Sequence, residues 1–220
     1  MTTLTTTAPP ARTEGNPVRG RFNSWFLDLL DQYIERRLGD VRSELLGGLD
    51  GEVAEIGAGN GPTFRHMRPG TVVHAIEPNP YVHRRLAAEA RRRSIELVLH
   101  PVSAERIDLP EGSVDAVVSS LVLCTVADPA AVLAEVRRIL RPGGRFIFLE
   151  HVGAEPGSAV RLVQRMVARP WRWVFEGCHT LRDTAHTIHA AGFASVDVRD
   201  IRMATAFVPI QPQIVGTAIR

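Results

Sequence analysis

The chain has 220 residues, of which 45% are apolar and 23% charged, enough for one globular domain with a sizeable core and too apolar for a disordered peptide. All 26 positive charges are arginine, which excludes Schiff-base, P-loop and general-base lysines and the enzyme classes that need them. With 24 acids the net charge is +2, which is not typical of a nucleic-acid-binding protein. The two cysteines, Cys124 and Cys178, are too few for a disulfide framework and favour reduced, intracellular thiols.

Residues 1–20 are rich in Thr, Pro, Gly and Arg and have no apolar periodicity, so we expect a flexible arm there. The arm lacks the apolar core of a signal peptide, and no stretch of the chain offers the roughly 18 consecutive apolar residues that span a membrane. The sequence therefore predicts a soluble, cytoplasmic protein. Residues 21–220 are expected to form a single domain, in which apolar residues at three- and four-residue steps predict an amphipathic helix or helix pair over residues 21–46.

After this segment the hydrophobic period changes. Short apolar runs that are typical of buried strands occupy residues 53–56, 72–76, 97–99, 114–118 and 146–149. Helix-like stretches lie between them, most clearly over residues 81–93 and 129–140. A further helix over residues 180–191 is followed by strand-like stretches at 195–201 and 213–219. Strands that alternate with helices predict an α/β fold with a doubly wound, mostly parallel sheet.

A glycine-rich turn follows the first strand, with Gly57, Gly59 and Gly61 at alternate positions. Glycines at the carboxyl end of such a strand let backbone N–H groups approach a ligand closely, although the same turn can serve packing alone. A dinucleotide fingerprint would need another glycine three positions after Gly59, and Pro62 stands there. The sequence therefore disfavours a nicotinamide oxidoreductase on this sheet.

Two acidic residues follow the next two strands. Glu77 lies twenty residues after Gly57, where a carboxylate could accept both hydroxyls of a ribose or could cap the following helix. Glu105, in the sequence Ser103-Ala104-Glu105, could lie near an adenine amine or in an exposed turn. Either carboxylate would lie at the ligand-binding edge of the predicted sheet.

Five motifs in chain order resemble those of class I S-adenosylmethionine-dependent methyltransferases. They are Glu55-Ile56-Gly57-Ala58-Gly59-Asn60-Gly61, Glu77-Pro78-Asn79-Pro80, Ser103-Ala104-Glu105, the run Leu-Pro-Glu-Gly-Ser-Val-Asp-Ala-Val-Val over residues 109–118, and Leu140-Arg141-Pro142-Gly143-Gly144. The resemblance implies a Rossmann-like, seven-stranded methyltransferase sheet, mostly parallel with an antiparallel last strand. It also implies that S-adenosyl-L-methionine binds at Glu55, Gly57, Ala58, Gly59, Asn60, Gly61, Glu77, Pro78, Ala104, Glu105, Ser120 and Leu121.

Residues 120–126, 148–152, 176–179 and 209–216 further resemble the methyltransferase-like 7 group of alkyl-thiol S-methyltransferases. This resemblance implies methyl transfer to the thiol of a small, fairly apolar molecule, either a secondary metabolite or a toxic thiol. O-, N- and quinone C-methylation are alternatives within the same chemistry, and a binding module without catalysis is another. The animal members carry an apolar membrane anchor where this chain has the Thr/Pro/Arg arm, so we expect no membrane span.

Methyl transfer from a sulfonium is an in-line displacement, so the protein chiefly aligns the reactants and excludes water. A thiol with a pKa of about 8.5 needs only a modest base or a nearby cation. His151, expected at the end of the fifth strand, and His179, before the next predicted helix, are the candidate catalytic residues. Cys178 is interpreted as a packing cysteine and Cys124 as a core residue.

Histidines at positions 186 and 189 share a predicted helix face with Asp183, but no further ligand of matching spacing follows, so we predict a surface position and no metal site.

The aromatic residues cluster in two segments, with Phe22, Trp25 and Phe26 in one and Trp171, Trp173 and Phe175 in the other. We expect these segments, with the N-terminal helices, to form a lid over an apolar acceptor pocket, although they could equally fill a helix–sheet contact. The near-neutral charge favours a small-molecule substrate over nucleic acid. The oligomeric state is left open.

Overall fold

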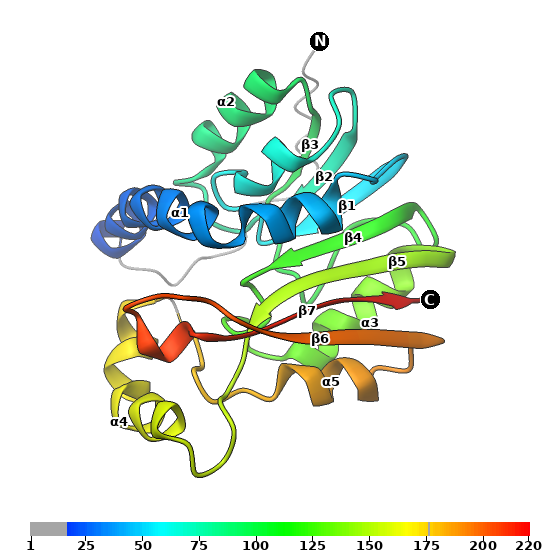
Figure 1. The fold of residues 1–220 in the computed structure, drawn as a ribbon. Coiled ribbons are helices and arrows are strands. Elements are labelled where there is room, and N and C mark those ends of the chain that lie inside the picture. Colours follow the sequence, from blue (N-terminus) through cyan, green and yellow to red (C-terminus); the bar gives the residue numbers. More distant parts are fainter. Residues whose placement is uncertain (1–16, 176) are drawn as a thin grey trace.

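The computed structural model describes residues 17–175 and 177–220, with side chains from residue 32 onward. In chain order the elements are α1 (Pro17–Leu46), β1 (Glu52–Ile56), η1 (Pro62–His66), β2 (Val72–Ile76), α2 (His83–Arg93), β3 (Glu96–His100), β4 (Val114–Ser120), α3 (Pro129–Ile139), β5 (Leu140–His151), α4 (Ala159–Val174), α5 (Thr184–Ala190), β6 (Ser195–Arg202), η2 (Val208–Ile210) and β7 (Pro212–Ile219). Here η denotes a short 3₁₀ helix. Figure 1 shows their arrangement.

The strands form one seven-stranded sheet in the order β3-β2-β1-β4-β5-β7-β6. Strands β1 to β5 pair in parallel, and β7 runs antiparallel to both of its neighbours, β5 and β6. The Rossmann-like, mostly parallel sheet predicted from the sequence is therefore confirmed. The direction of strand order reverses between β1 and β4, and in open α/β sheets a ligand binds beyond the carboxyl ends of the strands at such a switch point.

The central strands are largely buried because both faces of the sheet are covered. Side chains of a strand alternate between faces, so Val53 packs into one core cluster and Ala54, its neighbour, into the other. In β5, Phe146 and Phe148 join the second cluster while Ile147 joins the first. This double burial explains why the strands are short apolar runs rather than alternating apolar and polar residues.

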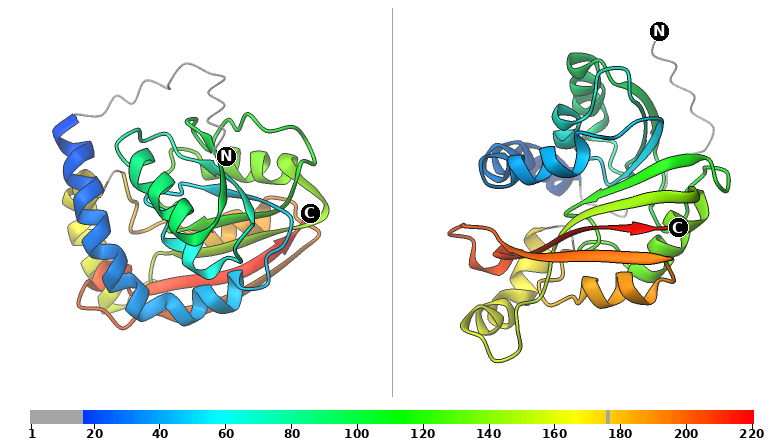
Figure 2. Two further views of the ribbon diagram at one scale, coloured as in Figure 1. Left: turned by 90° about the horizontal axis from the view of Figure 1, so that it is seen from above. Right: turned by 45° about the vertical axis from the view of Figure 1, so that its right-hand side comes forward.

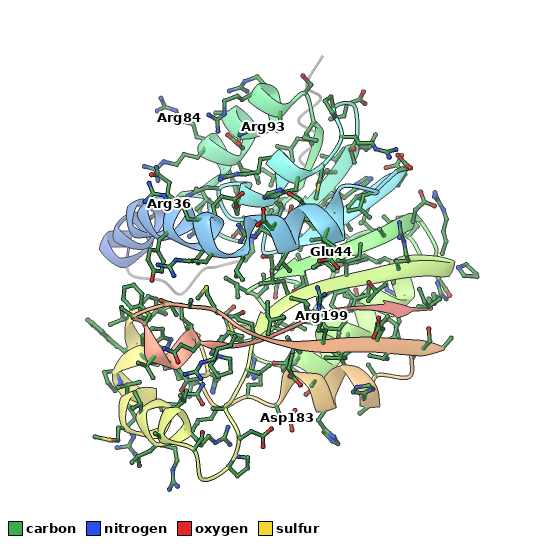
Figure 3. All side chains as sticks on the ribbon, in the orientation of Figure 1. Arg36, Glu44, Arg84, Arg93, Asp183 and Arg199 are labelled. Carbon is green, nitrogen blue, oxygen red and sulfur yellow. The ribbon has the colours of Figure 1, made fainter. Side chains whose placement is uncertain are left out.

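Helices cover the two faces separately, with α1, η1 and α2 on one face and α3 and α5 on the other (Figures 1 and 2). Helix α3 is capped by Asp128, whose carboxylate accepts hydrogen bonds from the backbone N–H groups of Ala130 and Ala131. Pro129 occupies its first turn, where the missing N–H costs nothing. Helix α5 begins at Thr184 rather than at residue 180 because the Asp183 side chain caps it by accepting from His186 N (Figure 3).

Two further boundaries differ from the sequence prediction, and one segment had no predicted structure. Residues 17–46 form a single helix, one of the two predicted alternatives, and it begins four residues before the predicted start at residue 21. Strand β5 already begins at Leu140, and its register with β4 shifts so that Val114 pairs with Leu140 and Ala116 with Arg145. Residues 153–175, which have no clear pattern, contain α4, capped by the Ser158 side chain.

Helix α1, helix α4 and the segment between β6 and β7 gather at the edge of the sheet where β1, β4 and β5 end (Figure 2). The Tyr33 hydroxyl of α1 donates to Thr205 Oγ1 at 2.9 Å, and its ring meets Phe207 edge-on. Further along, Glu44 of α1 pairs with Arg199 of β6 at 3.2 Å (Figure 3). Helix α1 therefore contacts both β6 and the segment between β6 and β7. No helix among the described residues is long and apolar enough to span a membrane.

Candidate active site

A cavity of about 1000 Å³ lies beyond the carboxyl ends of the parallel strands. One part of its wall comes from the turns after β1, β2 and β3, including Gly57, Ala58, Gly59, Asn60, Glu77, Pro78, Ala104 and Glu105. The other part comes from the turn after β4, the end of β5, α4 and the β6–β7 segment, including Ser120, Leu121, Cys124, His151, Trp171, Phe175, Cys178, Phe207, Ile210 and Gln213. We call these parts the glycine-loop half and the aromatic half.

The turn after β1 needs glycine at two of its positions for different reasons. Gly57 has φ +61°, and a Cβ there would lie 2.7 Å from Val122 Cγ2, so the close approach of the two turns requires its absence. Gly59 has φ +54°, and a Cβ there would meet nothing within 4 Å. Because Gly59 lines the cavity, that open space is room for a ligand against exposed backbone.

Glu77 and Glu105 hold the glycine-loop half in shape. One carboxylate oxygen of Glu77 accepts the Gly59 N–H at 2.8 Å, and the other accepts the Asn79 N–H at the same distance. Glu77 does not cap α2, whose first turn has no side-chain cap. Glu105 accepts hydrogen bonds from Ala127 N and from the hydroxyl of Ser103, and although burial opposes it, hydrogen bonding led by Ser103 lowers the pKa of Glu105.

Two further carboxylates are buried beneath the cavity. Both oxygens of Glu55 accept from the Thr63 hydroxyl, at 2.7 Å, and burial raises the pKa of Glu55 to about 7. Glu150 accepts hydrogen bonds from the Ser119 hydroxyl and from the backbone of residues 122 and 123, and burial raises its pKa to about 7 as well. Glu150 thereby fixes the turn after β4, in which Leu121 holds a left-handed conformation with φ +62°.

At the deep end of the aromatic half, Cys124, His151 and Cys178 meet. The two sulfurs lie 3.8 Å apart, and Cys178 Sγ lies 3.9 and 4.0 Å from the two ring nitrogens of His151. The indole N–H of Trp171 donates to Cys178 Sγ at 3.3 Å, and Trp171 packs on Phe175 with ring centroids 4.1 Å apart. The hydrogen bond between the thiols lowers the pKa of Cys178 and, together with burial, raises that of Cys124.

Comparison with known proteins decides the family. A family model described as "Methyltransferase domain" matches residues 54–148. The chain is 36% identical over 180 residues to thiol S-methyltransferase TMT1B of Rattus norvegicus, covering 80% of this chain and 74% of the relative. It is 34% identical over 169 residues to thiol S-methyltransferase TMT1A of Homo sapiens, covering 76% and 69%. The chain belongs to the methyltransferase-like 7 family. It is an S-adenosylmethionine-dependent methyltransferase.

Solved structures agree on the fold. The methyltransferase superposes with a TM-score of 0.63 on a possible histamine N-methyltransferase of Thermotoga maritima, at 19% identity and covering 91% of this chain and 99% of that one. A geranyl diphosphate methyltransferase in complex with GPP and sinefungin gives a TM-score of 0.61 at 17% identity, covering 82% and 76%. At these identities the likeness concerns the architecture alone.

The described residues of the methyltransferase fit S-adenosylmethionine. The space over Gly59 accepts a ligand against the backbone, and the Glu77 carboxylate, which orients the Gly59 N–H, lines the same cavity. Single-ligand pockets usually measure about 300–1000 Å³, so this cavity also has room for a small methyl acceptor beside the cofactor.

The structure brings most of the predicted site residues to one cavity, but not all of them. Glu55 and Gly61 do not line the cavity. Neither does His179, whose backbone N–H donates to Cys124 O. Trp173 lines the cavity although 72% of it is exposed. The side chains of the predicted substrate residues Phe22, Trp25 and Phe26 lie outside the described residues.

Several residues of the methyltransferase cavity were not predicted from the sequence. Cys124 and Cys178, interpreted as core and packing residues, line it beside His151. Arg42 of α1 reaches it as a buried cation that donates to Ser120 Oγ at 3.3 Å and pairs with Glu35 at 3.1 Å. Gln213 lies opposite His151 in the β5–β7 register. A polar residue in the final apolar strand was the one signal that could have indicated Gln213.

Proposed function

We propose that the methyltransferase transfers the methyl group of S-adenosylmethionine to the sulfur of a small, fairly apolar thiol. The observation that carries this proposal is the position of the buried His151 with the two cysteines, in the wall of the same cavity that the glycine turn lines. The family relatives that support it are named thiol S-methyltransferases. The smallness of the acceptor follows from the volume that the cavity leaves beside a cofactor.

The chain's own residues perform two tasks in this proposal. The aromatic half, with Trp171 stacked near Phe175, packs against an apolar acceptor and excludes water from the displacement. His151 is the buried group positioned to take the proton of the acceptor or to stabilise its anion. S-adenosylmethionine supplies a methyl group on a positively charged sulfonium, so no covalent enzyme intermediate is needed. A thiol, already a few per cent ionised at neutral pH, requires far less activation than an alcohol.

The proposed acceptor atom is tested with three compounds that share one carbon skeleton and carry sulfur, oxygen or nitrogen at the same position. The purified chain is incubated with radiolabelled S-adenosylmethionine and phenylmethanethiol, phenylmethanol or phenylmethylamine, with a methyl-accepting quinone in a fourth reaction. We expect label to appear in the thioether alone. Label in the ether, the amine or the quinone, without thioether, would contradict thiol methylation and favour the corresponding alternative.

A further inference from the structure

The cluster of Cys124, His151 and Cys178 has the composition and spacing of a metal site. Their candidate ligand atoms, two sulfurs and one ring nitrogen, lie within 4.8 Å of one another, and all three residues are buried. The two sulfurs are 3.8 Å apart. Two thiolates bound to one tetrahedral Zn²⁺ at about 2.3 Å each would also be about 3.8 Å apart. The sulfur positions therefore match an ion of this class without movement of the backbone.

Polar groups around the cluster resemble the outer partners of such an ion. The indole N–H of Trp171 already donates to Cys178 Sγ at 3.3 Å, which stabilises a thiolate. Gln213 faces His151 across the β5–β7 pair, so the two side chains share one face of the sheet. Its buried amide oxygen has no hydrogen-bond partner in the part of the chain that the structure describes. That oxygen is an acceptor for the N–H of a histidine whose other nitrogen binds a metal.

We infer that Cys124, His151 and Cys178 bind a single Zn²⁺-type ion and leave its fourth position open to the cavity for the acceptor's sulfur. Two thiolates and one imidazole form a ligand set that selects zinc and related soft metals over Mg²⁺ or Ca²⁺. All three residues line the cavity, so an ion among them faces the space between the glycine turn and α4. Three protein ligands with one exchangeable position are the arrangement of catalytic rather than structural zinc.

This inference rests on the proposed thiol acceptor and assigns the stabilisation of its anion to the ion, with His151 as a ligand. The acceptor thiol binds the ion through sulfur and releases its proton to solvent, because coordination strongly favours the thiolate. A sulfur lone pair then forms the new S–C bond to the methyl carbon, and the bond from that carbon to the sulfonium breaks with its electron pair on the cofactor's sulfur. The products are a thioether, S-adenosylhomocysteine and one proton.

The binding test uses the full chain, reduced with a phosphine, freed of metal with a chelator and titrated with Co²⁺ as a spectroscopic substitute for Zn²⁺. We expect one ion per chain and a near-ultraviolet charge-transfer band from thiolate to cobalt. Cys178→Ala and Cys124→Ala should each weaken Co²⁺ binding more than about 100-fold, and Gln213→Leu about tenfold, the lower end of an outer-partner effect. Absence of the band in the unaltered chain, or its persistence in Cys178→Ala, overturns the inference.

His189→Ala is the matched control, because it removes an exposed histidine from α5 and should leave Co²⁺ binding unchanged. Binding of S-adenosylhomocysteine by calorimetry establishes that each variant still folds. Phenylmethanethiol added to the cobalt-loaded chain should intensify the charge-transfer band, whereas phenylmethanol should not. An unchanged band with the thiol would overturn the assignment of the fourth position.

Assays of thiol methylation distinguish a failure of the inferred metal site from a failure of the proposed function. The metal-free chain should bind S-adenosylhomocysteine with unchanged affinity, lose thiol methylation and regain it with Zn²⁺. Full thiol methylation by the metal-free chain would overturn the metal site while leaving the proposed function intact. Co²⁺ binding with the expected spectrum, but no thiol methylation by the zinc-loaded chain, would overturn the proposed function and the role of the fourth position.

Discussion

The glycine-loop half and the aromatic half of the cavity are built in opposite ways. In the first, the residues that line the cavity lie in turns that directly follow β1, β2 and β3. In the second, side chains that lie far apart in the sequence converge, so that Cys124 meets Cys178 across 54 residues and His151 meets Cys178 across 27. One half therefore depends on local sequence, and the other on the packing of α4 and the β6–β7 segment.

This difference assigns cofactor binding to one half of the cavity and the choice of methyl acceptor to the other. Turns at the ends of parallel strands lie at the ligand-binding edge in chains with this sheet, and here they contribute glycine backbone together with the Glu77 carboxylate. The aromatic half determines which acceptor fits, because its shape and polarity come from individual side chains. Substitutions in the first half should affect cofactor binding, and those in the second should affect the acceptor.

The largest effect is expected for Gly57→Ala, which places a Cβ against Val122 at a left-handed position. Overpacking of about 1–3 kcal/mol and the left-handed penalty of about 1–2 kcal/mol together predict a loss of about 4 kcal/mol in the free energy of unfolding. Affinity for S-adenosylhomocysteine should fall about 100-fold, which corresponds to about 2.7 kcal/mol, because the displaced turn no longer holds its backbone against the cofactor. Urea denaturation and calorimetry measure the two quantities.

Two controls isolate the cause in Gly57→Ala. Gly70→Ala has a similar positive φ, +86°, but open space around the new Cβ, so it should cost about 1 kcal/mol and leave cofactor binding unchanged. Adding Val122→Ala to Gly57→Ala should restore part of the lost affinity. Full cofactor binding by Gly57→Ala alone would contradict the tight approach of the two turns.

The next prediction concerns how the free energy of unfolding of Glu55→Gln depends on pH. Because burial raises the pKa of Glu55 to about 7 in the folded chain, this residue binds a proton more tightly there than when unfolded, and stability falls as pH rises from about 4.5 to about 7. Glu55→Gln removes this loss, so the stability of the variant relative to the unaltered chain should rise by up to about 3 kcal/mol between about pH 4 and pH 8. Urea denaturation across pH measures it, with Glu96→Gln, an exposed residue of β3, as the control that should parallel the unaltered chain.

Glu77→Gln should weaken S-adenosylhomocysteine binding about 10- to 100-fold, the range expected for losing hydrogen bonds to a charged group. The amide also places a donor against the N–H groups of Gly59 or Asn79, which loosens the glycine turn. Calorimetry measures the change, again against Glu96→Gln. Unchanged affinity in Glu77→Gln would remove this carboxylate from the cofactor site.

The smallest effect tests the aromatic half. Trp171→Ala should raise KM for phenylmethanethiol about tenfold through lost aromatic packing, with unchanged affinity for S-adenosylhomocysteine. Trp171→Phe keeps a ring beside Phe175 but removes the N–H that reaches Cys178, so it separates packing from hydrogen bonding. Met166→Ala, at a 73% exposed position of the same helix, should change neither quantity. A weakened cofactor affinity in Trp171→Ala would contradict the division into two halves.

Most of the fold follows from local patterns in the sequence. The five parallel strands contain short apolar runs, which are most buried in β1, β4 and β5, and the change of hydrophobic period after Gly48 marks where the sheet begins. The extents of α1 and α5 were less predictable because end effects decide them, as with the Asp183 cap that starts α5 four residues late. Residues 153–158 lack any periodic signal, since their conformation is set by contacts such as Ala154 N to Gln164 Oε1.

The residues of the candidate site likewise fall into those that local sequence predicts and those that tertiary packing places. Gly57, Gly59 and Glu77 were predictable because a turn after a strand lies at the ligand edge whatever the rest of the chain does. Cys124 and Cys178 were interpreted as packing residues because no local spacing relates them, and only the docking of the segment after α4 brings their sulfurs together. That the α1 segment acts as a lid stays a prediction.

The central claim is that a cofactor in the glycine-loop half presents its methyl group to the cluster in the aromatic half. A crystal structure of the full chain with S-adenosylhomocysteine tests it directly, because the product's sulfur marks the place from which the methyl group departs. We predict that this sulfur lies between the Gly57 turn and the cluster of Cys124, His151 and Cys178, with its open side toward them. A sulfur that faces away from this cluster, toward solvent or α1, would contradict the account.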